Sequence, residues 1–284
     1  MHSRIRHLSR YRYGEPVASG HHLLRLRPRP LPHQNLRHGE LAIDPKPSQR
    51  RIHQDYFGNP IDYALQIEPH DHLTVTTTLE VEVGDRPEVA AEMTWESAVA
   101  WHEGAIDSAR LACGEFRLDS RLAPRHAAIV DYVRHSFIAD RPLGEALDDL
   151  LARVHADFAY APGTTHVATT VGEVLARRQG VCQDFAHLVI AGLRGLGFAA
   201  RYVSGYLHPG PGLSGADASH AWVAVYVPGQ GWLEIDPTNR CRAGQGHVTL
   251  CYGRDYSDIA PIQGVLVGGG KHSLEVKVDF IDLK

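Results

Sequence analysis

Short alternating runs of apolar and polar residues fill the first part of the chain, from residue 3 to about residue 83. A period of two is the pattern of strands with one buried face. Proline and glycine segments interrupt the runs, since proline lacks an N–H and glycine favours turns. The runs are RIRHLSRYRY, HLLRLRPRP, ELAIDP, IDYALQIEP and LTVTTTLEVEV, and the breaks are residues 14–16, 28–32, 44–47 and 58–60. We therefore predict a small antiparallel β domain over residues 1–84.

After residue 124 the apolar residues recur at i, i+3 and i+4, which is the spacing of one face of a helix. Helices are predicted over residues 125–137, 143–158 and 171–178. Thr170 could cap the third of these, with Glu173 three residues on as the partner of a capping box. The stretch 85–124 has no single period, and Trp95 and Trp101 are its expected packing anchors. A second domain with helices near its start is therefore expected from residue 85.

The segment 182–196 is apolar on nearly every side, which favours a buried central helix over a surface helix. Gly195 and Gly197 are expected to end it. Strand-like runs follow as ARYVSGYL, HAWVAVYV and GWLEIDP, separated by a Pro/Gly loop at 209–215 and a Pro-Gly-Gln-Gly turn, and SLEVKVDFIDL should add a last strand. This order predicts an α+β domain, with helices packed on an antiparallel sheet, that spans residues 85–284.

Composition changes this picture little, because 43% hydrophobic and 22% charged residues are typical of globular proteins. A core can form without disulfides or metals. The net charge of −4 is uneven: residues 1–54 hold 11 Lys/Arg against 3 Asp/Glu, a local excess of +8, and the remainder carries −12. These arginines alternate with apolar residues, so we interpret them as the wet face of a sheet and expect no nucleic-acid partner.

The four cysteines, Cys113, Cys182, Cys241 and Cys251, show neither CxxC spacing nor the density of a disulfide scaffold, so we expect reduced thiols. The first residues lack the apolar segment of a signal peptide, and no run of about 18 apolar residues occurs, so a cytoplasmic protein without a membrane partner is expected. The 19 histidines form no HExxH motif or His/Cys quartet. We therefore expect neither a metal nor a cofactor.

Three residues have the chemistry of a nucleophilic site. Cys182 immediately precedes the predicted buried helix, where unpaired backbone N–H groups and the helix dipole stabilise a thiolate. His220 starts one predicted strand and Asp236 ends the next. Strands of a hairpin lie about 4.8 Å apart, so the imidazole and the carboxylate come within reach if both face the helix. The carboxylate would then orient the imidazole, whose other nitrogen meets the thiol.

Each of these residues alone has an ordinary explanation, because lone cysteines and histidines are often inert core residues and Asp before Pro starts turns well. Asp184, in the first helical turn, suits the helix dipole and is expected to be structural. Tyr206 and Trp222 could wall a substrate cleft, although aromatic residues at such positions are more often core. For the oxyanion, the backbone N–H of Cys182 is a natural donor, and Gln183 is a candidate for the second.

The segments GVCQDFAHL, LGFAARYVSGYL and SHAWVAVYVPGQGWLEIDPT together resemble the catalytic core of bacterial transglutaminase-like proteins, over about residues 155–255. RYRYGEPV, LLRLRPRP and DYFGNP resemble the β domain that commonly precedes this core, and GRDYSDIAPIQGVLVGGG resembles the same group's ending. The resemblance implies a fold similar to papain-like cysteine proteases. It also implies Cys182 as nucleophile, His220 as general base and acid, and Asp236 as orienting carboxylate.

A Cys–His–Asp site forms a thioester, which water or an amine then resolves. We expect hydrolysis of amide or peptide bonds, isopeptide bonds included, because proteolytic roles are widely proposed for the bacterial proteins that the chain resembles. No calcium site of DxDxDG type is present, so calcium-dependent cross-linking is not implied. Transamidation or deamidation of protein glutamine is the alternative.

A non-catalytic binding module on the same fold is an alternative of another class, since fold alone does not prove function. The complete set of Cys182, His220 and Asp236 argues for an enzyme with a peptide or protein substrate. The basic β domain could steer an acidic substrate, wall the cleft or mediate formation of a homo-oligomer. The identity of the substrate does not follow from the sequence, because it depends on loops such as residues 209–219.

Overall fold

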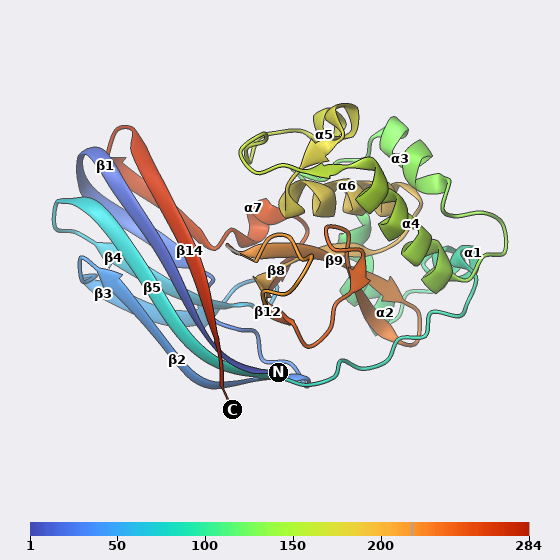
Figure 1. Ribbon diagram of the computed structural model, residues 1–284, viewed down its shortest axis with the longest axis horizontal. Coiled ribbons are helices and arrows are strands. Elements are labelled where there is room, and N and C mark those ends of the chain that lie inside the picture. The colour runs from blue at the N-terminus through green and yellow to red at the C-terminus, as the bar shows by residue number, and fades with distance from the viewer. Residues whose placement is uncertain (217, 284) are drawn as a thin grey trace.

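The computed structural model describes residues 1–216 and 218–283, which form a curved β sheet and a mixed helix and sheet unit beside it (Figure 1). The first sheet is antiparallel, with the order β2-β5-β1-β4-β3. Its strands are β1 (His2–Leu24), β2 (Gln34–Asp44), β3 (Gln49–Gln54), β4 (Pro60–Gln66) and β5 (His70–Val83). The predicted N-terminal β domain is therefore confirmed.

Strand β1 runs through residues 14–16, where a break was predicted, and ends at Leu24, so the predicted strand HLLRLRPRP was wrong beyond that residue. The register between β1 and β5 shifts between Arg12 and Val17. Pro16 lies inside this irregularity, so its missing N–H removes no bond of the ladder, and its carbonyl oxygen still accepts from the N–H of Gly269. The proline thus shifts the register without ending the strand.

The C-terminal strands join the N-terminal sheet. Strand β13 (Ile262–Gly268) pairs with the second half of β1, and β14 (His272–Asp282) pairs with the first half, from Ser3 to Tyr13. Figure 1 shows β14, in red, beside β1, in blue. The predicted last strand exists, but the sheet assigns residues 262–282 to the β domain and not to the second domain. Alternation predicts a strand without naming its partner, and β1 is long enough to pair with two.

The second unit is built on a five-stranded antiparallel sheet with the order β11-β10-β9-β8-β12. Its strands are β8 (Ala200–Leu207), β9 (His220–Val227), β10 (Gly231–Asp236), β11 (Cys241–Arg242) and β12 (His247–Gly253). A short parallel pair, β6 (Ala159–Tyr160) and β7 (Gln179–Gly180), lies before the central helix. The three strands predicted after that helix are confirmed, whereas β11 and β12 were not predicted.

The helices of this unit are α1 (Trp95–Trp101), α2 (Ser108–Gly114), a 3-10 turn (Glu115–Arg117), α3 (Ala127–Arg134), α4 (Leu143–Asp157), α5 (Val171–Arg177), α6 (Cys182–Gly195) and α7 (Tyr256–Ile259). The capping box of α5 is confirmed: Thr170 Oγ1 accepts from the N–H of Glu173, whose carboxylate accepts from the N–H of Thr170 at 2.9 Å. None of the described helices has the length and apolar character needed to cross a membrane.

Helix α6 is the buried centre of the unit, as predicted, with α3 on one side and β8 and β9 on the other. It ends at Gly195, and Gly197 follows with a φ of 101°. Two glycines bring α3 close, since a Cβ added at Gly192 or Gly195 would lie 2.3 Å or 2.1 Å from a valine methyl of α3. This packing fixes the position of the first residue of α6, Cys182.

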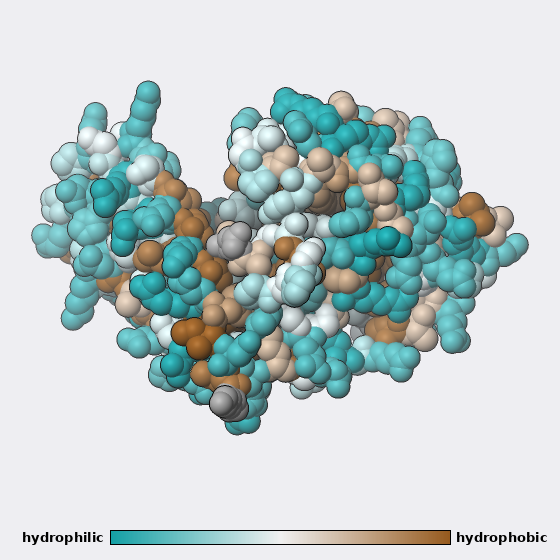
Figure 2. All heavy atoms as spheres, viewed as in Figure 1, coloured by the Kyte–Doolittle hydropathy of each residue, from teal (hydrophilic) through white to brown (hydrophobic). Residues whose placement is uncertain are grey.

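The β domain closes the free edge of the second sheet. Gln34 exchanges two hydrogen bonds with the backbone of Thr249 at 2.8 and 2.7 Å, and Asn59 does the same with Tyr252 at 2.8 Å. These side chains take the place of a neighbouring strand along β12, which would otherwise expose unpaired backbone groups. The space-filling view shows a notch between the two parts on one face, above the region where they meet (Figure 2).

Candidate active site

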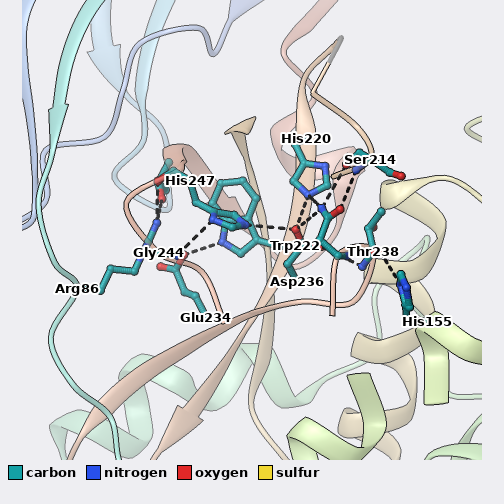
Figure 3. A network of polar contacts seen from close by, with 12 residues as sticks. Arg86, His155, Ser214, His220, Trp222, Glu234, Asp236, Thr238, Gly244 and His247 are labelled. Carbon is teal, nitrogen blue, oxygen red and sulfur yellow. Dashed lines mark hydrogen bonds and ion pairs between the residues drawn. The ribbon is translucent and has the colours of Figure 1, made fainter. Parts of the chain in front are cut away.

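The hairpin of β9 and β10 brings His220 and Asp236 together. Ile235 pairs with Val223, so the two side chains lie diagonally across the hairpin on one face. Nε2 of His220 lies 2.8 Å from Oδ2 of Asp236, and both residues are fully buried. The predicted contact between imidazole and carboxylate is present, and Figure 3 shows it at the centre of a polar network.

His220 and Asp236 lie on the face of the sheet that is turned away from the body of α6, whereas the face toward this helix was expected. Val223 and Val225 of β9 pack in the same cluster as α6, whereas Trp222 packs in a separate cluster on the other face. His220 has the strand parity of Trp222, so it does not point toward the body of α6. His220 still interacts with Cys182, because His220 is the first residue of β9, Cys182 is the first residue of α6, and these two ends lie next to each other.

Charge in the site favours a protonated imidazole. Burial lowers the pKa of His220, but interactions with Cys182 and Asp236 outweigh burial and raise it to about 10. Burial would raise the pKa of Asp236, yet His220 and His247 hold it well below its usual range. Nδ1 of His220 is buried and makes no hydrogen bond of normal geometry within residues 1–216 and 218–283. This nitrogen is the one left to exchange a proton with the thiol.

Two residues that the sequence did not indicate complete the surroundings of Asp236. Oδ2 also accepts from Nε2 of His247 at 3.2 Å and from Nδ2 of Asn239 at 2.7 Å, while Oδ1 accepts from the N–H groups of Thr238 and Asn239. These five donors hold the carboxylate as an anion in one orientation. His247 starts β12, as His220 starts β9, and that repeated position was the available signal.

His220, Asp236 and His247 also form a group that could hold a metal ion, with ligand atoms within 4.8 Å of one another. Two imidazoles and a carboxylate suit zinc. No metal site was predicted from the sequence, because metal-binding motifs such as HExxH place their ligands close together in the chain. His220, Asp236 and His247 instead come from three different strands. In this structure the same atoms are hydrogen-bonded to one another.

The start of α6 leaves backbone donors free. Its N-cap, Val181, has no side-chain acceptor, unlike Thr94, Asp107 and Thr170, which cap α1, α2 and α5. Among residues 1–216 and 218–283, the N–H groups of Asp184 and Phe185 donate to the carbonyl oxygen of Val181, whereas those of Cys182 and Gln183 have no acceptor and are available to a substrate oxygen. The side chain of Cys182 is 8% exposed.

Asp184 has the structural role that was expected of it. Its Oδ2 accepts from the N–H of Val181 at 2.8 Å and from Oγ1 of Thr165 at 2.6 Å, which ties residues 161–169 to the start of α6. Burial raises the pKa of Asp184, and these two hydrogen bonds oppose that rise. The carboxylate supports the turn that carries Cys182.

A loop covers the imidazole. The side chain of Asn239 bonds to the backbone of Ser214 through Oδ1 at 2.8 Å and Nδ2 at 3.2 Å. The next residue, Gly215, has a φ of 87°, and a Cβ there would lie 2.6 Å from Nδ1 of His220. Only glycine lets the backbone approach the ring so closely. The predicted Pro/Gly loop thus forms part of the site.

The other three residues predicted for the site, Tyr206, Trp222 and Gln183, lie in different surroundings. Tyr206 is fully buried at the junction with the β domain, where its hydroxyl is hydrogen-bonded to Nδ1 of His7 at 2.9 Å, so its proposed place in a cleft wall was wrong. Trp222 is also fully buried; it donates to Glu234 at 2.6 Å and stacks on His220. It supports the imidazole from behind. Gln183 is half-buried in the first turn of α6 and stays a candidate oxyanion donor.

Comparison with known proteins agrees with this architecture over nearly the whole chain. Residues 3–82 match the model of the bacterial transglutaminase-like N-terminal region, and residues 128–237 match that of the transglutaminase-like superfamily. A solved structure of a candidate cysteine protease from Cytophaga hutchinsonii aligns with a TM-score of 0.75 at 20% identity, covering 100% of this chain and 92% of that chain. At this identity the likeness concerns the fold, which is the predicted papain-like and transglutaminase-like one.

Two relatives in sequence complete the comparison. An uncharacterised protein of Mycobacterium tuberculosis is 39% identical, over 98% of this chain and 92% of its own length. A protein-glutamine gamma-glutamyltransferase of Pseudomonas aeruginosa is 32% identical over 51% of this chain and 22% of its own length. From the two family models and the near full-length relative, the chain belongs to the bacterial transglutaminase-like family.

Proposed function

We propose that the protein is a cysteine-nucleophile enzyme that cleaves amide or peptide bonds, isopeptide bonds included, through Cys182, His220 and Asp236. The 2.8 Å contact between His220 Nε2 and Asp236 Oδ2 carries the proposal, because it leaves Nδ1 free for Sγ of Cys182. A carboxylate behind the imidazole stabilises the imidazolium that forms when the thiol loses its proton.

The proposed reaction consists of two acyl transfers. The thiolate of Cys182, whose proton already lies on His220, attacks the carbonyl carbon, and the carbonyl oxygen takes the negative charge beside the start of α6. The C–N bond then breaks as the imidazolium of His220 gives its proton to the leaving amine, which leaves a thioester and a neutral imidazole. Water attacks the thioester with His220 as general base, the carboxylic acid is released, and the thiolate and imidazolium are restored.

Alkylation by iodoacetamide, followed residue by residue with mass spectrometry across pH, tests the nucleophile. We expect Cys182 to react selectively below about pH 7, because a thiolate paired with an imidazolium reacts where an ordinary thiol does not. Burial raises the pKa of the Cys113 thiol, and it raises those of Cys241 and Cys251 to about 11 and about 12, so these three should stay protonated. His220→Ala should abolish the selective reaction.

Two controls make this outcome specific. His135→Ala removes an exposed histidine after the end of α3 and should leave the alkylation profile unchanged. Cys241 is more exposed than Cys182, so it would react first if access alone set the rates. Equal rates at the two thiols, or a selective reaction that survives in His220→Ala, would contradict the proposal and favour a binding module.

Transamidation is the second candidate, favoured by the sequence similarity to the Pseudomonas aeruginosa protein-glutamine gamma-glutamyltransferase. Both reactions share the thioester on Cys182 and differ in the group that resolves it. A blocked glutaminyl-glycine peptide, supplied with and without a fluorescent primary amine, separates them by mass spectrometry. Amine incorporation indicates transamidation, conversion of glutamine to glutamate indicates deamidation, and cleavage of the peptide bond indicates the proposed hydrolysis.

Replacing His247 tests the surroundings of Asp236. His247→Ala removes one of three donors to Oδ2 and should slow alkylation of Cys182 about tenfold, the effect of one charge-assisted hydrogen bond. His247→Gln, which can still donate an N–H, should recover part of the rate. The pH profile of alkylation provides the check, since a variant that only loosened the fold would lower the amplitude without moving the profile.

A further inference from the structure

A cavity separate from the candidate active site lies on the face of the five-stranded sheet that is turned away from α6. Its volume is about 420 Å³, and the linker at residues 85–89, strand β10 and the loop at residues 242–245 surround it. The residues used in the argument below are Arg201, Trp232, Tyr252, Arg86, Glu234 and His33. This volume lies within the range of small-molecule sites, and we name it the Arg201 cavity.

Arg201 is the unusual group in this cavity. Its guanidinium lies between two aromatic rings, 4.0 Å from the centre of Trp232 and 3.6 Å from that of Tyr252. It makes no hydrogen bond or ion pair with any residue of the described ranges 1–216 and 218–283, and its Nε is buried without a partner. Two rings fix the plane of a cation whose N–H donors have no acceptor from the protein.

Other buried arginines of this chain have acceptors. Arg194, which is 1% exposed, donates to the carbonyl oxygens of Phe116, Ala200 and Arg254. Arg86, on the wall of the same cavity, lies 2.9 Å from a carboxylate oxygen of Glu234. Arg201 is half-buried on the cavity wall, and its Nε is a buried donor without an acceptor among residues 1–216 and 218–283, which is costly unless a bound group supplies one.

The charge of the cavity favours a ligand with one negative charge. Burial lowers the pKa of Arg201 to about 10, which keeps it protonated at neutral pH. The carboxylate of Glu234 is already matched by Arg86 and by N–H and O–H donors of Trp222 and Tyr252. Arg242, the third arginine of the lining, pairs with Asp148, so Arg201 is the described arginine of the cavity that has no carboxylate partner. The acidic side chains of the rim, Asp85 and Glu88, oppose a dianion such as phosphate.

Two further donors and the apolar walls suit the same ligand. Both ring nitrogens of His33 and the Nε of Arg86 are buried and have no partner in the part of the chain that the structure describes. Burial lowers the pKa of His33, so its ring is neutral at pH 7 and offers one N–H. Trp232 and Tyr252, whose rings contact the guanidinium, also contribute aromatic atoms to the cavity wall. A carboxylate accepts two parallel N–H bonds from an arginine, and its apolar part could pack on these rings.

We infer that the Arg201 cavity is a binding site for a small organic monocarboxylate, held by the guanidinium of Arg201 with its apolar part against Trp232. The site is separate from the proposed nucleophile and does not depend on the reactivity of Cys182. One side chain, Trp222, connects the cavity to the candidate active site. Trp222 donates to Glu234 of the cavity wall and stacks on His220.

Calorimetric titration of the full-length protein with benzoate, benzamide and inorganic phosphate tests the inference. Benzoate should bind. Benzamide, which has the same shape without the charge, should bind about tenfold more weakly or worse, since a charge-assisted hydrogen bond accounts for about that factor. Phosphate should also bind about tenfold more weakly or worse, because the acidic rim of the cavity opposes a dianion. Arg201→Gln should lose benzoate binding. Arg201→Lys keeps the charge but not the fork, and it should bind benzoate about tenfold more weakly than the wild type.

Arg29→Lys is the matched control. Arg29 also lies over the Tyr252 ring, at 4.7 Å, but its guanidinium donates to Phe57 and Asn59, and Arg29 is not among the residues that line the cavity. Benzoate affinity should be unchanged in this variant. Equal binding of benzoate and benzamide, tighter binding of phosphate, benzoate binding in a folded Arg201→Gln protein, or wild-type benzoate affinity in a folded Arg201→Lys protein would each overturn the inference. Circular dichroism of each variant identifies the folded ones.

Discussion

Asp236→Asn should lower the Cys182-dependent hydrolysis of p-nitrophenyl acetate by about 10⁴-fold, the effect of the same change in other nucleophile–His–Asp sites. The amide keeps the shape of the carboxylate but places an N–H₂ group or a neutral oxygen where two histidines now donate. The imidazolium that balances the thiolate loses its counter-charge. Rates measured beside a Cys182→Ala protein, which sets the background, give the comparison.

The same variant should change how stability depends on pH. The pKa of His220 is raised from 6.5 to about 10 in the folded state, so its contribution to stability is complete below pH 6.5 and is lost as pH rises through about 10. The pKa of Asp236 is lowered, so its contribution is present above its unfolded value and is lost in acid. Asp236→Asn should flatten the urea-unfolding midpoint between pH 6.5 and 10 and lower it at pH 7, because breaking a buried pair costs about 3–5 kcal/mol.

Asp148→Asn is the matched control for Asp236→Asn. Asp148 pairs with Arg242 on the surface, where both side chains are exposed and such pairs contribute little. Ester hydrolysis and unfolding midpoint should both match the wild type. Should Asp236→Asn retain wild-type turnover while folded, the carboxylate would have no orienting role, and His220 would have to act without it.

The elements that the sequence predicted correctly are those whose signals are local. Helix α6 is apolar on nearly every side, Thr170 and Glu173 are three residues apart, and β8 and β9 begin and end where the runs ARYVSGYL and HAWVAVYV do. The pairing of His220 with Asp236 was also accessible, because a hairpin with a four-residue turn leaves little freedom in register. Local patterns were therefore sufficient for the contact between His220 and Asp236.

What the sequence did not reveal depends on distant partners or lacks a hydrophobic pattern. Strand β3 is exposed at every position and holds a single large apolar residue, Ile52, so no alternating pattern marks it. The partner of β14 lies about 270 residues earlier in the chain, as the bond from Ser3 to Asp282 illustrates. His247 and Asn239 join the site only through the sheet and the loop beyond β10, and Arg201 draws attention only once its missing acceptors can be counted.

The role of the β domain also became visible only in three dimensions. Its basic strands were expected to steer a substrate, wall a cleft or mediate self-association, whereas Gln34 and Asn59 act inside the chain by completing the edge of β12. That edge carries His247 at its start, so the β domain holds one of the donors to Asp236 in place. A polar side chain that replaces a strand has no sequence signature of its own.

Gly205→Ala should destabilise the protein by about 3 kcal/mol or more, the upper range for overpacking. Gly205 pairs with His220 of β9, and a Cβ there would lie 2.0 Å from the carbonyl oxygen of Val248 and 2.5 Å from Cη2 of Trp222. The first of these atoms is backbone, so the strand itself must move. Because Trp222 stacks on His220, the movement should also slow alkylation of Cys182.

Gly114→Ala separates this clash from the general effect of replacing a glycine. Gly114 ends α2, and no atom of residues 1–216 or 218–283 lies within 4 Å of a Cβ added there, apart from its neighbours in the chain and its own helix. Alanine should therefore leave stability unchanged or raise it by up to about 1 kcal/mol through helix propensity. Urea unfolding of both variants provides the comparison. A Gly205→Ala protein as stable as the wild type would mean that β8 and β12 can move apart at this point without cost. The packing of the sheet would then not fix the positions of Trp222 and His247 behind the candidate site.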